Sequence, residues 1–224
     1  LVRNPQGDIV RANFMEKLLT TLLSRLSNFI PEAGIWMNTL RPEWNDANNA
    51  LVGYGASMVT LYYMRRFVSF LSGILQTVSS EKFEISVELA DFLHAVDHSL
   101  RQFLPRLKAG FDDAHRRKVT DQLGYAGSLY REKIRYGFCC RKESIRAEYL
   151  IHFLNLVQQY IDQSIDKNRR NDRLYHAYNL VSFSQDKLSL RHLHEMLEGQ
   201  VAVLSSGRLE AGEAAEILDA MRKS

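Results

Sequence analysis

The chain has 224 residues, of which 46% are hydrophobic and 25% are charged, and its formal net charge is +3. This length is sufficient to bury a sizeable core. The basic runs at 115–118 and 167–170 carry no interleaved aromatic residues, which argues against nucleic acid as a partner. The most apolar stretch, 51–78, contains Arg65 and Arg66 at its centre, so we expect a buried helix there and no membrane association.

Apolar residues recur at three- and four-residue steps over most of the chain, a spacing typical of amphipathic helices. Asp8 and Ser86 stand where helix N-caps are expected. The alternation near 178–190 predicts two short strands around a turn, which is a small β-hairpin. The expected helices cover residues 8–28, 56–78, 86–108, 113–136, 142–167, 191–205 and 210–222.

Seven helices with mostly short connections predict an all-α fold of antiparallel helix hairpins, apart from the hairpin of strands. We expect residues 1–224 to form a single helical domain. No linker rich in proline, glycine or serine divides the chain.

The two cysteines, Cys139 and Cys140, are adjacent in the sequence. A disulfide between neighbours would be strained, so two free thiols favour a cytoplasmic protein. His94 and His98 lie four residues apart, but they lack the glutamate of a metalloprotease helix. We therefore predict a helix edge at these histidines, no metal site and no cofactor.

The long connection from Ile30 to Gly55 contains both tryptophans and a polar centre, RPEWNDANN at 41–49. Long connections in compact domains are usually functional or disordered, and the apolar anchors of this one argue against disorder. One interpretation is local: Asp46 or Asn45 caps a helix that starts near Ala47. The other is a saccharide site, because sugars are bound by carboxylate, amide and guanidinium groups together with an aromatic face. Its candidate substrate-binding residues are Trp36, Arg41, Trp44, Asn45, Asn48 and Asn49.

Cleavage of a glycosidic bond needs a carboxylic acid that protonates the leaving oxygen. Glu43 stands beside an apolar tryptophan and three residues before Asp46, two features that favour its protonated form. The candidate catalytic residues are therefore Glu43 as the general acid and Asp46 as its carboxylate partner.

The segment RPEWNDANNALVG, residues 41–53, resembles the catalytic loop of carbohydrate-active enzymes built on an (α/α)6 toroid. Cellobiose phosphorylases carry Gly-Asp-Trp-Asn-Asp-Gly-Met-Asn there, and the first Asp is the proposed general acid. Glu43 occupies that position here, and Trp44, Asn45, Asp46 and Asn49 match. Pro42 replaces the first glycine, and Ala47-Asn48 replaces Gly-Met. Maltose phosphorylases likewise place a catalytic Glu before an aromatic residue.

This resemblance implies cleavage of an oligosaccharide by phosphorolysis or inverting hydrolysis. Inorganic phosphate would be a co-substrate in the first case, and the turn at Gly53–Gly55 with Arg41 is a candidate place for it. A full toroid has twelve helices, so we expect this chain to be part of a larger catalytic domain and to meet the remainder of its own polypeptide. The competing function is a non-catalytic helical module that binds carbohydrate or a partner protein.

Overall fold

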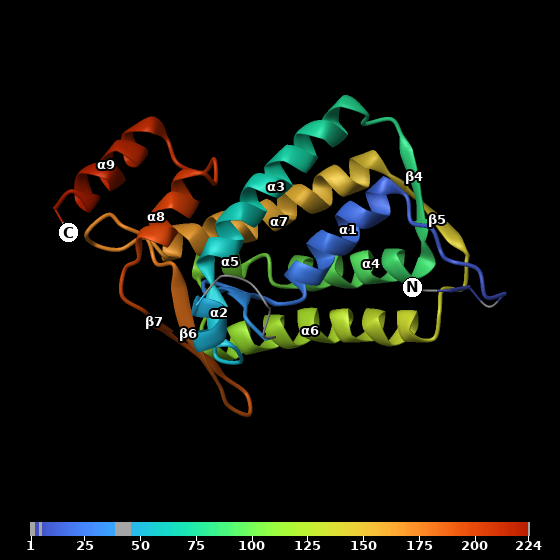
Figure 1. Ribbon diagram of the computed structural model, residues 1–224, viewed down its shortest axis with the longest axis horizontal. Coiled ribbons are helices and arrows are strands. Elements are labelled where there is room, and N and C mark those ends of the chain that lie inside the picture. Colours follow the sequence, from blue (N-terminus) through green and yellow to red (C-terminus); the bar gives the residue numbers. More distant parts are fainter. Residues whose placement is uncertain (1–2, 5, 39–45, 224) are drawn as a thin grey trace.

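The computed structural model describes residues 3–4, 6–38 and 46–223, and for residues 46–48 it describes the backbone alone. Long helices pack on one another beside a five-stranded antiparallel sheet, and a two-stranded sheet lies at the other end of these helices (Figure 1). The fold is therefore mixed α/β. The prediction of an all-α domain forming part of an (α/α)6 toroid is wrong.

Five long helices supply the main core: α1 (Phe14–Leu26), α3 (Met58–Thr77), α4 (Val87–Gln102), α6 (Asp113–Arg135) and α7 (Ala147–Lys167). Helix α3 packs along α7, α4 packs along α6, and α1 lies against α4. Each helix buries one apolar stripe, as its periodicity predicts. The N-cap of helix α1 is Asn13 and not Asp8, so the helix begins five residues later than predicted, because Asn13 and Glu16 form a capping box. None of the described helices is long and apolar enough to cross a membrane.

The larger sheet has the strand order β1-β2-β3-β6-β7 and every pairing in it is antiparallel. The hairpin of β6 (Tyr178–Phe183) and β7 (Leu188–His192) confirms the hairpin predicted near 178–190. The other three strands, β1 (Phe29–Ile30), β2 (Gly34–Trp36) and β3 (Gly55–Ser57), were not predicted. With two or three residues each, they are too short to show an alternation in the sequence. Their close approach requires Gly34, where a Cβ atom would lie 2.6 Å from the carbonyl oxygen of Ser57.

The smaller sheet pairs β4 (Lys82–Ser86) with β5 (Lys142–Arg146), and it connects the beginnings of α4 and α7. Residues 142–146 were predicted as helix, and this prediction is wrong because they pair with residues 82–86 across the sheet. Pro105 ends the predicted helix 86–108 early, since it has no N–H group to donate, and a short helix α5 (Arg106–Ala109) follows. The remaining helices are α2 (Asp46–Leu51), α8 (Leu197–Leu204) and α9 (Ala211–Met221).

The side chain of Arg116 on α6 connects the two edges of the larger sheet. Its Nε donates to the carbonyl oxygen of Pro31, directly after β1, at 3.1 Å, and its Nη1 donates to that of Leu188 in β7 at 3.0 Å. The other contacts are an ion pair with Glu32 at 2.9 Å, one with Asp113 at 2.7 Å, and a bond to the carbonyl oxygen of Phe111. All donor positions of the guanidinium group are thus used, at a residue that is only 5% exposed.

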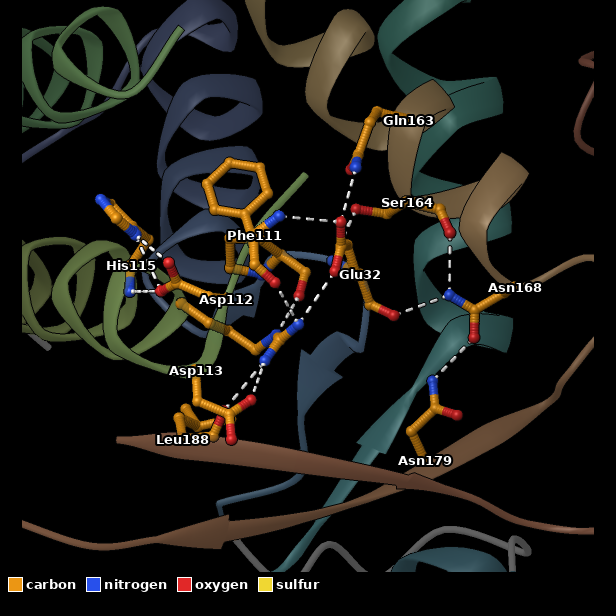
Figure 2. Close-up of polar contacts among 12 residues, drawn as sticks. Glu32, Phe111, Asp112, Asp113, His115, Gln163, Ser164, Asn168, Asn179 and Leu188 are labelled. Atoms are coloured by element: carbon orange, nitrogen blue, oxygen red, sulfur yellow. Dashed lines mark hydrogen bonds and ion pairs between the residues drawn. The ribbon is translucent and has the colours of Figure 1, made fainter. Parts of the chain in front are cut away.

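Glu32 lies in the turn between β1 and β2, and it binds α6, α7 and the connection between α5 and α6 (Figure 2). Its carboxylate accepts hydrogen bonds from the backbone N–H of Phe111, from Gln163 and from Arg116. Its own backbone donates to the hydroxyl of Ser164 and accepts from Asn168. The backbone of Glu32 has a φ of +65°, a value that residues other than glycine rarely adopt, and these contacts stabilise that conformation.

We predict that Arg116→Leu lowers the free energy of unfolding by about 3–5 kcal/mol, because it leaves the buried carboxylate of Glu32 without its cation. Urea denaturation measures the change. Lys133→Leu is the matched control: its ion pair with Asp91 is about half exposed, and it should change stability by about 0–1 kcal/mol. Equal effects of the two substitutions would contradict the role given to Arg116.

Candidate functional site

The polar loop predicted as a saccharide site extends from the hairpin between β2 and β3. The backbone N–H of Met37 donates to the carbonyl oxygen of Gly55 at 2.8 Å, and that of Gly53 donates to the carbonyl oxygen of Met37 at 2.7 Å. These bonds continue the β2–β3 pairing beyond Trp36 and Ala56. The chain therefore leaves the sheet and returns to it through one pair of bonded segments. We call residues Trp36–Asn38 and Gly53–Gly55 the loop stem.

Trp36 forms one wall of the loop stem. Its indole Nε1 donates to the carbonyl oxygen of Gly53 at 3.1 Å, so the ring is attached to the returning strand. The Trp36 ring also contacts the ring of Phe183 on β6, with ring centroids 5.1 Å apart and planes inclined by 51°. The guanidinium group of Arg117 lies 5.6 Å from the centre of the Phe183 ring. The half-buried ring of Trp36 is thus fixed at the base of the polar loop.

The structure describes only part of the predicted site. Residues 39–45 lie outside the described residues, and they include Arg41, Glu43, Trp44 and Asn45. Helix α2 begins at Asp46, one residue before the predicted start, so part of the polar stretch is helical. For Asp46 and Asn48 the backbone alone is described, and Asn49 is exposed. Leu51 closes α2 and is buried, which anchors the returning segment to the core.

The turn at Gly53–Gly55 was also considered as a phosphate site at a helix N-terminus, and this prediction is wrong. Residues 55–57 form β3, and α3 begins only at Met58. The first amides of α3 already have partners: Met58 and Val59 donate to the carbonyl oxygen of Ala177, and Thr60 donates to the hydroxyl of Ser57. No amide of this first turn is left for an anion.

His94 lies at a helix edge, and both of its ring nitrogens have partners in the protein. Nδ1 lies 3.1 Å from the hydroxyl of Tyr149, and Nε2 lies 3.0 Å from the carboxylate of Glu143. Desolvation and the negative charge of Asp97 raise the pKa of Tyr149 well above its usual value, so its hydroxyl stays protonated. Among the described residues, no three His, Cys, Asp or Glu side chains gather in a way that could hold a metal ion.

A second polar site, which the sequence did not reveal, lies beside the β6–β7 hairpin and the segment that follows α7. His176 precedes β6 and His192 ends β7, and their rings stack with centroids 4.1 Å apart and planes inclined by only 7°. The two histidines line a cavity of about 460 Å³ together with Lys167, Arg169, Arg170, Asn171 and Asp172. We call this the histidine cavity. His192 was considered in the sequence as part of a helix, and this was wrong because it belongs to β7.

The hydrogen bonds of Asn179 determine which nitrogen of His192 carries the proton. The amide nitrogen of Asn179 donates to the carbonyl oxygen of Ala33 and to the side chain of Asn168, so its oxygen faces His192. Nδ1 of His192 lies 2.6 Å from that oxygen and must donate to it. Nδ1 of His176 lies 3.1 Å from the carbonyl oxygen of Leu193 and donates likewise.

With the proton on Nδ1, the Nε2 atom of each neutral imidazole is an acceptor. Burial, followed by the charges of His192 and Arg170, lowers the pKa of His176 to about 4, and burial also lowers the pKa of His192. Because the rings are nearly parallel, their in-plane lone pairs cannot converge on one ion. The histidine cavity suits hydrogen-bond donors better than a metal.

No protein-family model matches this chain, and no curated protein is similar to it.

We predict that the stability of the protein falls as the pH drops from about 6.5 to about 4, in part through His176. In this window the unfolded imidazole binds a proton and the folded one, with its pKa lowered to about 4, does not. Urea denaturation at several pH values should give a smaller fall for His176→Gln than for the wild type. His152→Gln, which removes an exposed imidazole, is the control, and the same fall in all three proteins would contradict the prediction.

Proposed function

We propose that this protein acts on an oligosaccharide at the loop that the loop stem carries, and that Glu43 protonates the oxygen of the scissile glycosidic bond. The observation that carries the proposal is the position of Trp36, a fixed aromatic side chain at the base of a segment rich in carboxylate and amide groups. An aromatic face together with several groups of fixed hydrogen-bond geometry is the combination that pyranose rings require.

The loop stem supports this role because it restrains both ends of the loop. Main-chain bonds between Met37, Gly53 and Gly55 close the base, and buried Leu51 holds the return. A loop closed in this way loses less conformational entropy when it binds a ligand than a loop with free ends. In the proposal, Arg41, Asn45, Asn48 and Asn49 orient sugar hydroxyls, and Asp46 is the carboxylate partner of Glu43.

The glycosyl group then passes to phosphate or to water. Phosphorolysis needs no protein base because phosphate itself attacks the anomeric carbon. Hydrolysis with inversion needs a second carboxylate about 6.5–9.5 Å from the acid. The two free, exposed thiols of Cys139 and Cys140 support placing this activity in the cytoplasm.

A second candidate function is binding of the saccharide without cleavage. One observation favours it: Glu32, the described carboxylate that precedes the loop most closely, is held by Arg116, Gln163 and the amide of Phe111. A carboxylate with these partners does not activate water. Glu32, in the β1–β2 turn, therefore does not supply the second carboxylate that hydrolysis with Glu43 as the acid would need.

The test uses saturation-transfer NMR with gluco- and manno-disaccharides, with and without phosphate, followed by product analysis. We expect the wild type and Glu43→Gln to bind the same sugar, and Glu43→Gln to cleave it about 10²–10⁴-fold more slowly, since it keeps the shape but lacks the acid proton. Glu84→Gln, at an exposed glutamate of β4, should cleave like the wild type. Binding without turnover in the wild type would favour the second candidate, and no binding would overturn both.

Trp36→Ala should weaken saccharide binding by about two- to tenfold, because a lost aromatic contact is worth about 0.5–1.5 kcal/mol. Trp36→Phe should retain most of the affinity because it keeps an aromatic face, although it loses the hydrogen bond to Gly53. Tyr136→Ala, at an aromatic residue that is 83% exposed, is the matched control. Titration followed by saturation transfer gives the three affinities, and an unchanged affinity in Trp36→Ala would remove Trp36 from the site.

A further inference from the structure

A mainly apolar cavity of about 420 Å³ opens at the end of the helices opposite the loop stem. The N-terminal segment, residues 9–12, forms one side, and α1, α4 and α6 form the others, with Phe138 at the rim. Figure 1 shows the N-terminal segment passing beside the end of α6, near β4 and β5. The volume lies within the range of about 300–1,000 Å³ that is usual for sites of small organic ligands.

The walls of this cavity are mainly apolar, and the hydroxyl of the buried tyrosine among them already has a partner. Leu89 and Tyr130 are buried, and Ile134 packs on the core beside them. The hydroxyl of Tyr130 interacts with Thr20, and burial raises the pKa of Tyr130, so this group stays neutral. Ile9 covers the cavity from the N-terminal segment but remains 51% exposed, so it leaves apolar surface accessible to a ligand.

The carboxylate in the cavity lining, that of Glu16, is satisfied by the protein. One oxygen accepts from the backbone N–H of Ser86 and from the ammonium group of Lys142, each at 2.7 Å. The other accepts from the backbone N–H of Asn13 at 2.9 Å. These bonds lower the pKa of Glu16 against the opposing effect of its burial, which would raise it. Glu16 is therefore an ionised group whose charge Lys142 balances.

Two further cations, Arg11 and Lys17, belong to the lining. Within the part of the chain that the structure describes, neither forms an ion pair, and Glu16 is already paired with Lys142. The cavity thus combines apolar walls with a net positive rim. This combination is complementary to a molecule with an alkyl chain and one negative charge.

We propose that this cavity binds a free alkyl carboxylate of medium chain length, with its chain between α1, α4 and α6 and its carboxylate at Arg11 and Lys17. The walls contribute affinity through the burial of methylene groups. The two cations determine the orientation and the preference for an acid over an alcohol. This site is separate from the loop stem and does not depend on the proposed saccharide function.

The test is titration calorimetry of the full chain with hexanoate, octanoate and decanoate, each below the concentration at which it forms micelles. We expect saturable binding of one molecule per chain. Each added methylene should tighten the Kd by up to about fourfold until the chain fills the cavity. Decanol and decyltrimethylammonium, which have the same chain without the negative charge, should bind more weakly than decanoate.

Substitutions then place the ligand in the cavity. Arg11→Gln and Lys17→Gln should each weaken decanoate binding by about two- to fivefold and leave decanol binding unchanged. Lys118→Gln, at an exposed lysine of α6 that lies outside the lining, is the matched control. Ala12→Phe adds a ring to the exposed N-terminal segment that lines the cavity, and it should weaken binding of every chain length while the protein remains folded.

Three results would overturn the proposal. One is the absence of saturable decanoate binding by the folded wild type. Another is equal binding of decanoate, decanol and decyltrimethylammonium, because the two cations would then have no role. The third is an unchanged Kd in Ala12→Phe, which would place the binding site elsewhere.

Discussion

The closure of the curled sheet by Arg116 is the constraint on which the rest of the structure depends. Strands β1 and β7 are the two edges of the larger sheet, and α6 contacts both of them. Arg116 donates to a carbonyl group at each edge. It also neutralises the carboxylate of Glu32, which binds both α6 and α7. An arginine suits this position because its planar group presents five donors in fixed directions and remains charged when buried. A lysine could not replace it, since an ammonium group has three donors and Arg116 donates to five acceptors.

From this ion pair a continuous path of hydrogen bonds leads to the histidine cavity. The backbone of Glu32 binds Asn168, and Asn168 binds Asn179 (Figure 2). Asn179 in turn binds His192. The hydrogen bonds of each amide fix its orientation, and the oxygen of Asn179 thereby selects the tautomer of His192 that carries its proton on Nδ1. The same turn of Glu32 connects β1 to β2, so the strand that enters the loop stem is fixed by the same contacts. The candidate saccharide loop therefore extends from a rigid base.

The two candidate ligand sites differ in how the fold constructs them. The loop stem is local: two strands and their main-chain bonds bring Met37 and Gly53 together, and Trp36 is added from the same hairpin. The apolar cavity is not local, because its walls come from three stretches that are distant in the sequence: residues 9–21, 86–89 and 130–138. Polar groups of fixed geometry dominate the first site and suit hydroxyl-rich ligands. Apolar walls with two cations dominate the second and suit an amphipathic acid.

The sequence by itself determined the long helices, because a stripe of apolar residues at helical spacing is a local property. The hairpin at 178–190 was determined in the same way, by alternation around a turn. The polar character of residues 41–49 could also be read directly, and it remains the basis of the proposed function.

The tertiary structure alone decided the cavities and the pairing of the strands other than the β6–β7 hairpin. Strands β1, β2 and β3 are two or three residues long. Strand β1 pairs with the neighbouring β2, β2 pairs with β3, and β3 pairs with β6, which is distant in the sequence. Residues 142–146 have a helical pattern but pair with residues 82–86, since the cross-strand contact of Phe83 with Ile145 outweighs a weak local preference. The environments of Glu32, His176 and Glu16 likewise come from distant partners. No local sequence pattern predicts such a partner. The packing of whole helices and strands decides which distant residues come into contact.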